Sequence, residues 1–408
     1  MYGPLICSRY ASRGLISLVN LAPRPFRCHH GYQGGFASYG ATGKGSYGAS
    51  LGKQNAIYFE PVRDMLLESI KTIPIRQNHV FNIGDYGTAD GATSMTFMTD
   101  LLKTLRDHHG PGTEFRVIHE DQELNDFNSL FRRLAGIIPD PPSYLEYLPN
   151  VYAHASSVHF HTQCVPSNSM HFIMSVAAAQ WLPKSPTVYK DSLYIYPDSS
   201  DAEKKALMKA GGEAWETFLT MRSKELIPGG LLFVAVCCEY TDASTGEPTY
   251  TSKSFLLLAT RVWREFRDSG KILEEEFINT NFPIYLQTRK QLTSPFTDLT
   301  SPVKRSGLQL LFSEVYINID VFYDAWMEKK EREGIDDRGE FARMYVAAHR
   351  NWSNSTFVNG LSETRSQEEK EKIVDELFAT IEKRMTSISP DEFKNDMGLN
   401  YLIIRKRA

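Results

Sequence analysis

Residues 79–91 decide the fold, and they read His-Val-Phe-Asn-Ile-Gly-Asp-Tyr-Gly-Thr-Ala-Asp-Gly. The first half of this stretch is apolar and suits a short strand, and the second half is a turn with glycines at positions 87 and 91. Residues 92–108 then place apolar side chains at helical spacing. A strand, a glycine turn and a helix in this order are typical of the opening of a doubly wound α/β sheet.

The glycine turn also indicates which ligand the fold would bind. Gly87 and Gly91 would let a ligand approach the backbone where a β-carbon would block it. The spacing D-x-G-x-x-x-G lacks the pyrophosphate-binding pattern G-x-G-x-x-G, and Asp85 at the strand end would repel a pyrophosphate. S-adenosylmethionine (SAM) carries an ammonium and a sulfonium but no phosphate, so the turn favours SAM. An NAD-dependent dehydrogenase is a distant alternative, because a catalytic Tyr-x-x-x-Lys is also missing.

A second acid follows the next predicted strand, residues 114–119. Asp121 stands at the end of that strand, where an acid in related dinucleotide folds accepts hydrogen bonds from both ribose hydroxyls. A loop acid that caps Asn125 or the following helix is the alternative interpretation.

The rest of the chain continues the α/β pattern. Further strands are expected at residues 151–155, 157–160, 231–236, 308–319 and 401–405, and helices at 61–73, 126–134, 167–181, 201–226, 255–269 and most of 324–386. With the first two strands this gives a seven-stranded sheet whose last strands pair antiparallel. Residues 241–310 break the rhythm and are interpreted as an insertion that caps the sheet.

Composition excludes several classes of protein. The chain has 408 residues and a formal charge of −4, and the absence of any apolar run of about 18 residues argues against a membrane span. The balanced charge argues against a nucleic-acid partner. The five cysteines form no C-x-x-C pair, which indicates a reducing compartment. An intracellular, soluble protein is therefore expected, with the cytoplasm favoured.

The basic and acidic residues are unevenly distributed. Residues 1–59 contain six basic residues and no acid, and the first acid is Glu60. The first 35 residues have the composition of a mitochondrial transit peptide, and an N-terminal tail or a gene-model artefact explains them equally well. Residues 1–38 are therefore treated as a basic extension, and residues 40–54 as a lid over the ligand.

Four blocks, in the same order, resemble the SABATH methyltransferases, which methylate salicylic, benzoic and jasmonic acids and include N-methyltransferases of the caffeine pathway. Ser46-Tyr47 with Gln54 resembles S-Y-A-x-N-S-x-x-Q, and residues 121–131 resemble N-D-L-P-x-N-D-F-N-x-L-F. Residues 165–172 with Trp181-Leu182 resemble F-P-S-N-S-L-H-F…W-L. Residues 218–230 resemble F-L-x-x-R-S-x-E-L-x-P-G-G. The resemblance covers about residues 45–405.

The resemblance implies a fold, an assembly and a set of site residues. The fold would be a class I SAM methyltransferase, a Rossmann-like seven-stranded sheet with an inserted, mainly helical cap within residues 241–310 and 325–365 of a 39–408 domain. The assembly would be a homodimer. The residues at SAM-binding positions are Tyr47, Asp85, Gly87, Gly91, Asp121, Gln122, His159 and Phe160.

The same resemblance also indicates which residues would bind the substrate and a metal ion. Gln54 and Trp181 fall at the positions that hold a substrate carboxylate, and Gln180 at a position that shapes the pocket. Some members bind Mg²⁺ near the cap, and Asn168 and Asn281 match ligand positions. The chain departs from the family pattern at Ser50-Leu51, throughout residues 86–93 and at Gln122.

Methyl transfer to a carboxylate needs no general base, because a carboxylate of pKa about 4 is already ionised at neutral pH. The protein has to hold the oxygen and the methyl carbon collinear and exclude water. Neutral donors such as an amide and an indole N–H position the carboxylate without holding back its charge. Residues 177–179 are all alanine, and on a pocket-lining helix they would leave room for a larger or longer acid.

Two other functions stay open at this point. One is N-methylation of a heterocycle such as a purine or alkaloid, which would depend less on Trp181. The other is a SAM-binding protein without catalysis that acts as an interaction module. The partners expected are therefore SAM and a small-molecule carboxylic acid, with no nucleic acid and no membrane.

Overall fold

The computed structural model describes residues 39–75, 79–186, 189, 191–195 and 199–407. All of them belong to one compact unit, residues 33–408. The transit-peptide hypothesis concerns residues 1–38, which lie outside the described residues. Among the described helices, none is long and apolar enough to cross a membrane.

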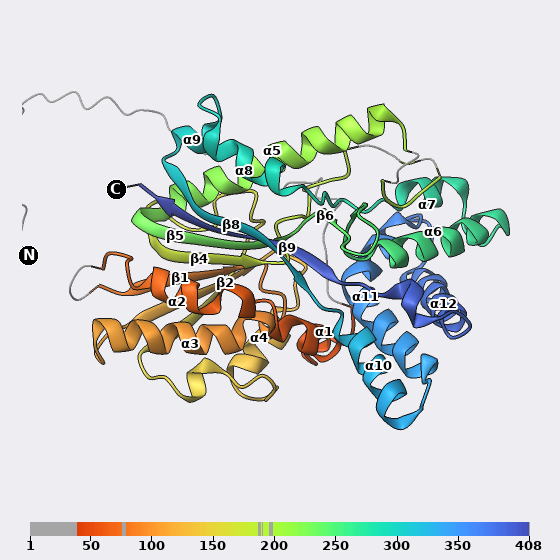
Figure 1. The fold of residues 1–408 in the computed structure, drawn as a ribbon, viewed down its shortest axis with the longest axis horizontal. Coiled ribbons are helices and arrows are strands. Elements are labelled where there is room, and N and C mark those ends of the chain that lie inside the picture. Colours follow the sequence, from red (N-terminus) through yellow and green to blue (C-terminus); the bar gives the residue numbers. More distant parts are fainter. Residues whose placement is uncertain (1–38, 76–78, 187–188, 190, 196–198, 408) are drawn as a thin grey trace, which may run out of the picture. The chain divides into compact units, whose positions relative to one another are not determined.

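One seven-stranded sheet forms the centre of this unit (Figure 1). Its strands run in the order β3-β2-β1-β4-β5-β9-β8. Their bounds are β1 Phe81–Tyr86, β2 Phe115–Asp121, β3 Val151–Ser157, β4 Met170–Val176, β5 Leu226–Cys237, β8 Leu308–Asn318 and β9 Met397–Lys406. The first five strands pair in parallel, and β9 pairs antiparallel with both β5 and β8. The predicted seven-stranded sheet with antiparallel last strands is confirmed.

The sequence prediction was wrong at the central strand β4. Residues 167–181 were expected to form a helix, but Met170–Val176 is a strand between β1 and β5. A parallel strand buried on both faces is a continuous apolar run, which periodicity cannot distinguish from a buried helix. The strand expected at residues 157–160 is mainly a loop, so the count of seven was correct although one strand was misplaced.

Helices cover both faces of the sheet. One face packs against α2 (Arg63–Ile70), α3 (Ala92–His109) and the short helix η1 (Glu60–Val62). The other face packs against α5 (Asp201–Glu225), α8 (Arg289–Thr297) and α9 (Pro302–Arg305). The helices α4 (Phe127–Leu134) and η2 (Tyr144–Glu146) lie in the connection from β2 to β3.

A second core builds the helical cap. It joins buried side chains of α6 (Lys253–Asp268), α7 (Glu274–Asn279), α10 (Val321–Glu333), α11 (Arg338–Gly360), α12 (Gln367–Met385) and η3 (Pro390–Phe393). The small ribbon β6 (Tyr240–Thr241) and β7 (Pro248–Thr249) precedes it. The cap therefore differs from the expected limits, because α8 and α9 pack on the sheet whereas α12 belongs to the cap.

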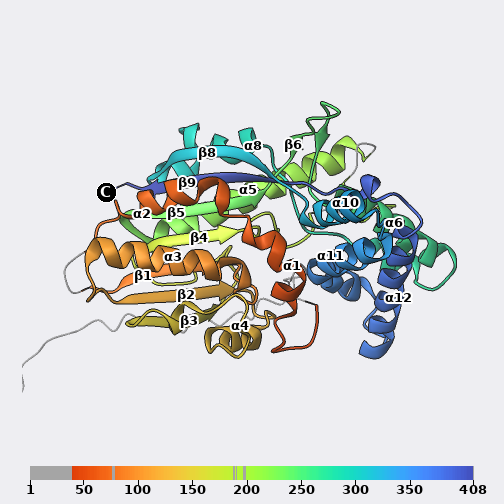
Figure 2. The same cartoon turned by 60° about the horizontal axis from the view of Figure 1, so that its bottom comes forward.

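The helix α1 (Ser46–Ala56) connects the sheet unit with the cap (Figure 2). On the sheet side, Gly48 N donates to Asp90 Oδ2 at 3.0 Å and Gly45 N donates to Ser129 Oγ at 2.8 Å. On the cap side, Asn351 Nδ2 donates to the carbonyl of Ser46 at 2.8 Å. The lid expected at residues 40–54 is thus held from both sides by hydrogen bonds to its backbone.

Two glycines of α1 allow a matched test of this packing. A β-carbon on Gly48 would lie 2.5 Å from Ala92 Cβ and 2.7 Å from Arg133 Nη2, whereas one on Gly52 would meet nothing within 4 Å. Alanine is the better helix former by about 1 kcal/mol. We expect Gly52→Ala to stabilise the protein by up to about 1 kcal/mol and Gly48→Ala to destabilise it by about 1–3 kcal/mol through overpacking. Urea unfolding measures both, and equal stabilisation by the two variants would contradict this packing.

Candidate functional site

The candidate cofactor site lies where the strand order of the sheet reverses. β1 is flanked by β2 on one side and β4 on the other, and ligands of such sheets bind outside the carboxyl ends of the strands at this point. Gly87, with a φ of 77°, follows β1, and a β-carbon on it would lie 2.4 Å from Ala178 Cβ in the turn after β4. The glycine is therefore required by the close approach of these two turns.

Asp85, the acid at the end of β1, is held by three neighbours. Its Oδ2 accepts hydrogen bonds from Thr88 Oγ1 at 2.7 Å and Ser94 Oγ at 2.6 Å. His119 Nδ1 lies 3.1 Å from the same oxygen. Since all three contacts go to Oδ2, the carboxylate has a fixed orientation with Oδ1 as its other acceptor.

His119 is a site residue that the sequence reasoning missed. Its side chain is fully buried, and its Nε2 lies 3.0 Å from the hydroxyl of Tyr144. It is the direct neighbour of Asp85 in the pairing of β1 with β2. A histidine on the same strand face as the apolar Phe115 and Val117 was the available signal, since a buried polar group requires a partner.

Asp121, the acid at the end of β2, holds the glycine turn. Its Oδ2 accepts from Ala89 N at 2.7 Å and its Oδ1 from Gln122 N at 2.8 Å. It does not cap the following helix, because Asp126 is the residue that caps α4. Burial raises the pKa of Asp121 to about 7, although the two backbone donors oppose the shift.

Tyr47 and Gln122 lie beside this acid. Burial, together with the nearby charges of Asp90 and Asp121, raises the pKa of Tyr47, whose hydroxyl bonds to Thr93. Gln122 is buried and its Oε1 accepts from Leu124 N at 2.9 Å. The lid helix and the loop after β2 thus meet at the glycine turn.

His159 and Phe160 form an aromatic wall next to the turn. The Phe160 ring packs edge-to-face on Phe218 with centroids 5.6 Å apart, and its Cε1 lies 4.0 Å from the β-carbon position of Gly87. Burial lowers the pKa of His159 to about 4, so this ring is neutral at physiological pH. Phe160 is only half-buried, which leaves part of its ring accessible to a ligand.

A buried ion pair between α4 and the glycine turn was also missed from the sequence. Arg133 Nη2 lies 3.0 Å from Asp90 Oδ2, and both side chains are at most 2% exposed. Asp90 stands in the stretch that departs from the SABATH pattern. Because the same oxygen also accepts from Gly48 N, the pair joins α4, the glycine turn and the lid.

The substrate candidates lie at the boundary between sheet and cap. Half-buried Trp181 packs edge-to-face against Trp352 of α11, with centroids 6.4 Å apart. Gln180 donates from Nε2 to Ala177 O at 2.8 Å, and its Oε1 is buried without a hydrogen bond. The three alanines lie in the turn after β4 and not on a helix, so the argument for a roomy pocket loses its helical basis.

Gln54 is occupied by the protein's own backbone. Its Nε2 donates to Ile319 O at 3.2 Å and its Oε1 accepts from Val321 N at 3.4 Å, at the junction of β8 and α10. The second N–H of the amide is what it can offer to a ligand.

The two metal candidates are not brought together. Asn168 N donates to Lys224 O before β5, at the amino end of β4, whereas Asn281 Oδ1 accepts from Tyr189 N beyond its carboxyl end. The seven residues of β4 alone span roughly 20 Å. Asn168 and Asn281 therefore cannot share one Mg²⁺ ion, and this prediction was wrong. Within the described residues, no group of three or more histidine, cysteine or acidic side chains could hold a metal.

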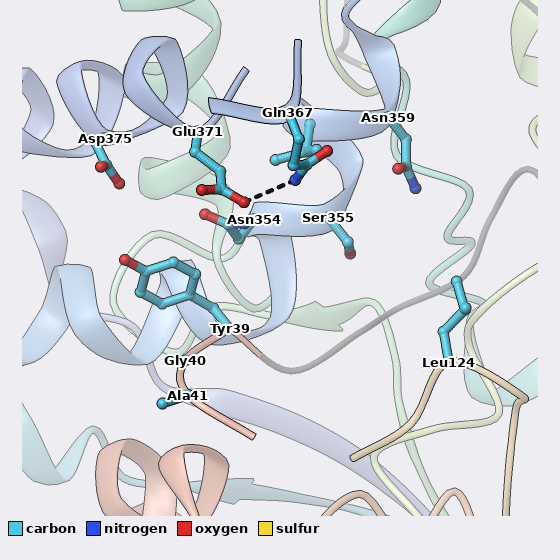
Figure 3. A pocket seen from close by; sticks show the side chains of 11 residues that line it. Tyr39, Gly40, Ala41, Leu124, Asn354, Ser355, Asn359, Gln367, Glu371 and Asp375 are labelled. Atoms are coloured by element: carbon cyan, nitrogen blue, oxygen red, sulfur yellow. Dashed lines mark hydrogen bonds between the residues drawn. The ribbon is translucent and has the colours of Figure 1, made fainter. Parts of the chain in front are cut away.

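A cavity of about 490 Å³ lies near the loop after β2 (Figure 3). It is lined by Tyr39, which directly precedes the lid, by Leu124 and by polar residues of α11 and α12, among them Asn354 and Glu371. Gln367 Nε2 donates to Glu371 Oε1 at 2.8 Å across its wall. None of the predicted site residues lines this cavity, so the candidate site lies elsewhere.

Comparison with known proteins identifies related sequences. Residues 35–407 match the family described as SAM dependent carboxyl methyltransferase. Gibberellic acid methyltransferase 2 of Arabidopsis thaliana is 24% identical over 252 residues, which cover 57% of this chain and 63% of that protein. Farnesoic acid carboxyl-O-methyltransferase of the same plant is 27% identical over 278 residues, which cover 64% and 76%. A 3,7-dimethylxanthine N-methyltransferase of Camellia sinensis also matches, at 24% identity over 60% of this chain and 70% of that protein.

A solved structure supports the fold. The structure described as loganic acid methyltransferase with SAH superimposes with a TM-score of 0.70 at 19% identity, and the match covers 91% of this chain and 99% of that one. At this level of identity the likeness concerns the fold alone. It confirms the predicted α/β methyltransferase architecture.

Proposed function

Because this chain belongs to the family of SAM-dependent carboxyl methyltransferases, we propose that it transfers a methyl group from SAM to the carboxylate of a small-molecule acid. The observation that carries the proposal is the meeting of Asp85, Asp121 and the glycine turn at the switch point of the sheet. Trp181 lies after β4, the strand next to β1, and so belongs to the same edge.

The residues of this edge fit SAM in their donors and charges. Bound SAM would supply an electrophilic methyl group on a sulfonium. The fixed carboxylate of Asp85 accepts hydrogen bonds from an ammonium, and that of Asp121 accepts from ribose hydroxyls. The half-buried face of Phe160 suits stacking on an adenine ring. Tyr47 closes the site from the lid.

The acceptor is held by neutral donors in this proposal. Trp181 and the remaining N–H of Gln54 would orient the carboxylate, and Gln180 would shape the pocket. An indole N–H fixes an oxygen in line with the methyl carbon without withdrawing its charge, so the gain is one of orientation. No side chain needs to remove a proton, because the acid is already ionised.

The substrate class proposed is a carboxylic acid larger than benzoate. The matched segments cover 63% of the length of the gibberellic acid methyltransferase and 76% of that of the farnesoic acid carboxyl-O-methyltransferase. Both acids are isoprenoids. A long or polycyclic isoprenoid acid is therefore the proposed acceptor.

A panel of acids tests this function directly. The full-length protein is incubated with methyl-labelled SAM and benzoate, salicylate, medium-chain fatty acids and isoprenoid acids, and methyl esters are extracted and counted. We expect labelled ester from the isoprenoid acids. SAM binding without turnover of any acid would favour the non-catalytic alternative, and good turnover of benzoate with none of the long acids would contradict the size assignment.

We also propose that the protein acts as a homodimer in the cytoplasm. The dimer follows from the SABATH resemblance, and light scattering of the purified protein tests it. A fluorescent reporter fused to residues 1–38 tests the competing hypothesis of mitochondrial targeting. Retention of the reporter in the cytosol supports the proposal, and import into mitochondria contradicts it.

Asp121 predicts a pH dependence of SAM binding. Burial raises its pKa to about 7 in the free protein, and donation from ribose hydroxyls favours the carboxylate, so the pKa falls when SAM binds. Binding then releases a proton, and the affinity should fall towards tenfold per pH unit well below 7 and level off about one pH unit above 7. Titration calorimetry between about pH 5.5 and 8 measures this.

Asp121→Asn is the control for that dependence. The variant should bind SAM more weakly, and its affinity for SAM should no longer change with pH. The neighbouring acid, Glu120, is unchanged in this variant. An unchanged pH dependence in Asp121→Asn would assign the proton to another group and contradict the prediction.

A further inference from the structure

We propose that the buried ion pair of Arg222 and Glu225 is a positioning device for the adenine side of the cofactor site. It would act by fixing the loop of residues 159–164, named here the Phe160 loop. This inference rests on the proposed function, because it concerns how the site holds SAM. Neither residue reaches the ligand itself.

Arg222 lies in the last turn of α5, and its guanidinium binds Glu225 and the Phe160 loop. Its Nε and Nη2 bind both oxygens of Glu225, at 2.7 and 2.8 Å. Its Nη1 donates to the carbonyl of Phe160 at 2.6 Å, and Nη2 also donates to that of Thr162 at 2.8 Å. Nε thus binds the acid, Nη1 binds the Phe160 loop, and Nη2 binds both.

Glu225 completes the attachment from the other side. Its Oε1 accepts from Cys164 N at 2.6 Å, at the far end of the same loop. Its Oε2 accepts from the hydroxyl of Tyr86, the last residue of β1, at 3.1 Å. The loop is therefore tied to the strand that carries Asp85 and leads into the glycine turn.

Burial makes this pair sensitive to geometry. Arg222 and Glu225 are both 0% exposed, and the guanidinium lies over the Tyr86 ring, 4.6 Å from its centroid. Residues 158–164 form no strand or helix, so the backbone of this loop needs other hydrogen-bond partners. The side chains of Arg222 and Glu225 are among these partners. Phe160 gains its position from these bonds and from its packing on Phe218.

Lysine cannot replace arginine in this role. An ammonium has three donors on one nitrogen, whereas the planar guanidinium reaches Glu225 and two carbonyls in fixed directions. Arg222→Lys keeps the positive charge beside Glu225 but releases the Phe160 loop. The variant should therefore disturb the adenine side of the site more than the acceptor side.

The first measurement is binding of S-adenosylhomocysteine (SAH), the proposed demethylated product, by calorimetry on the full chain. We expect the Kd of Arg222→Lys to rise about tenfold, within what one base–aromatic contact contributes. In turnover, KM for SAM should rise by a similar factor while KM for the acid stays unchanged.

A double-mutant cycle tests whether the effect runs through Phe160. In a Phe160→Ala background, Arg222→Lys should change the Kd for SAH by less than about twofold, because the ring it positions is gone. Equal effects in both backgrounds would overturn the proposal. Tyr86→Phe, which removes only the hydrogen bond to Glu225, gives a milder second variant with an expected rise of about threefold.

Arg365→Lys is the matched control. Arg365 also makes a bidentate pair with a buried acid, Glu276, and donates to a backbone carbonyl, but it lies in the cap. It should lose comparable thermal stability without any change in SAH affinity. A loss of affinity in both variants would reveal a general structural effect and overturn the proposal.

The outcomes separate this inference from the proposed function. If the wild-type protein binds no SAH, the proposed function fails. If the wild type binds SAH and both Arg222→Lys and Tyr86→Phe bind it equally well, only the positioning role fails.

Discussion

Replacing Asp85 by asparagine is expected to weaken SAM binding by about a hundredfold. The Oδ2 of Asp85 accepts hydrogen bonds from Thr88 and Ser94 and lies next to His119, and we propose that its Oδ1 accepts from the ammonium of SAM. An amide loses the negative charge opposite the ammonium of SAM, and a charge-assisted hydrogen bond contributes about 1.5–3 kcal/mol. The NH₂ group of the amide must either enter the cluster around Oδ2 or take the place of Oδ1, the acceptor proposed for the ammonium.

Calorimetric titration with SAM measures this effect, and Asp100→Asn is its control. Asp100 lies on α3 and pairs with Arg63 at 2.8 Å, where both side chains are partly exposed. The same chemical change there should leave the Kd for SAM within twofold of the wild type. If Asp85→Asn bound SAM as tightly as Asp100→Asn, Asp85 would not contact the cofactor, and the assignment of this edge would be wrong.

Local patterns predicted much of this fold because they report on one element at a time. The helix expected at residues 92–108 is α3, Ala92–His109, since its glycine turn and its apolar spacing mark both ends. The central strand β4 carries no such mark. Its burial on both faces comes from β1 and β5, which are distant in sequence, so the tertiary structure decides what the local pattern leaves ambiguous.

Some residues of the candidate site could likewise be predicted from local sequence patterns, and others could not. Asp85 and Asp121 were found because each ends a predicted strand, and the SABATH resemblance, confirmed by the family match, supplied the rest. The contact of Asp85 with His119 depends on the register of β1 against β2, which no local pattern encodes. The metal site predicted from Asn168 and Asn281 was wrong because a match to motif positions does not tell how far apart two residues lie in the fold.

Trp181→Phe should lower kcat/KM for the acid by about ten- to a hundredfold with KM for SAM unchanged. Phenylalanine keeps the ring against Trp352 but removes the N–H proposed to hold the substrate carboxylate. A hydrogen bond to a charged group contributes about 1.5–3 kcal/mol, which sets this range. Steady-state kinetics with the best acid of the panel gives the two constants separately.

Trp263→Phe shows whether a loss of kcat/KM in Trp181→Phe is caused by the missing N–H or by the smaller ring. Trp263 lies in the cap core, and its Nε1 is buried without a hydrogen-bond partner, so the same truncation removes no bond there. Its kcat/KM should stay within about threefold of the wild type even if the protein melts earlier. Equal losses in the two variants would mean that Trp181 supports the cap and does not hold the acid, and a heterocyclic nitrogen acceptor would then become the better hypothesis.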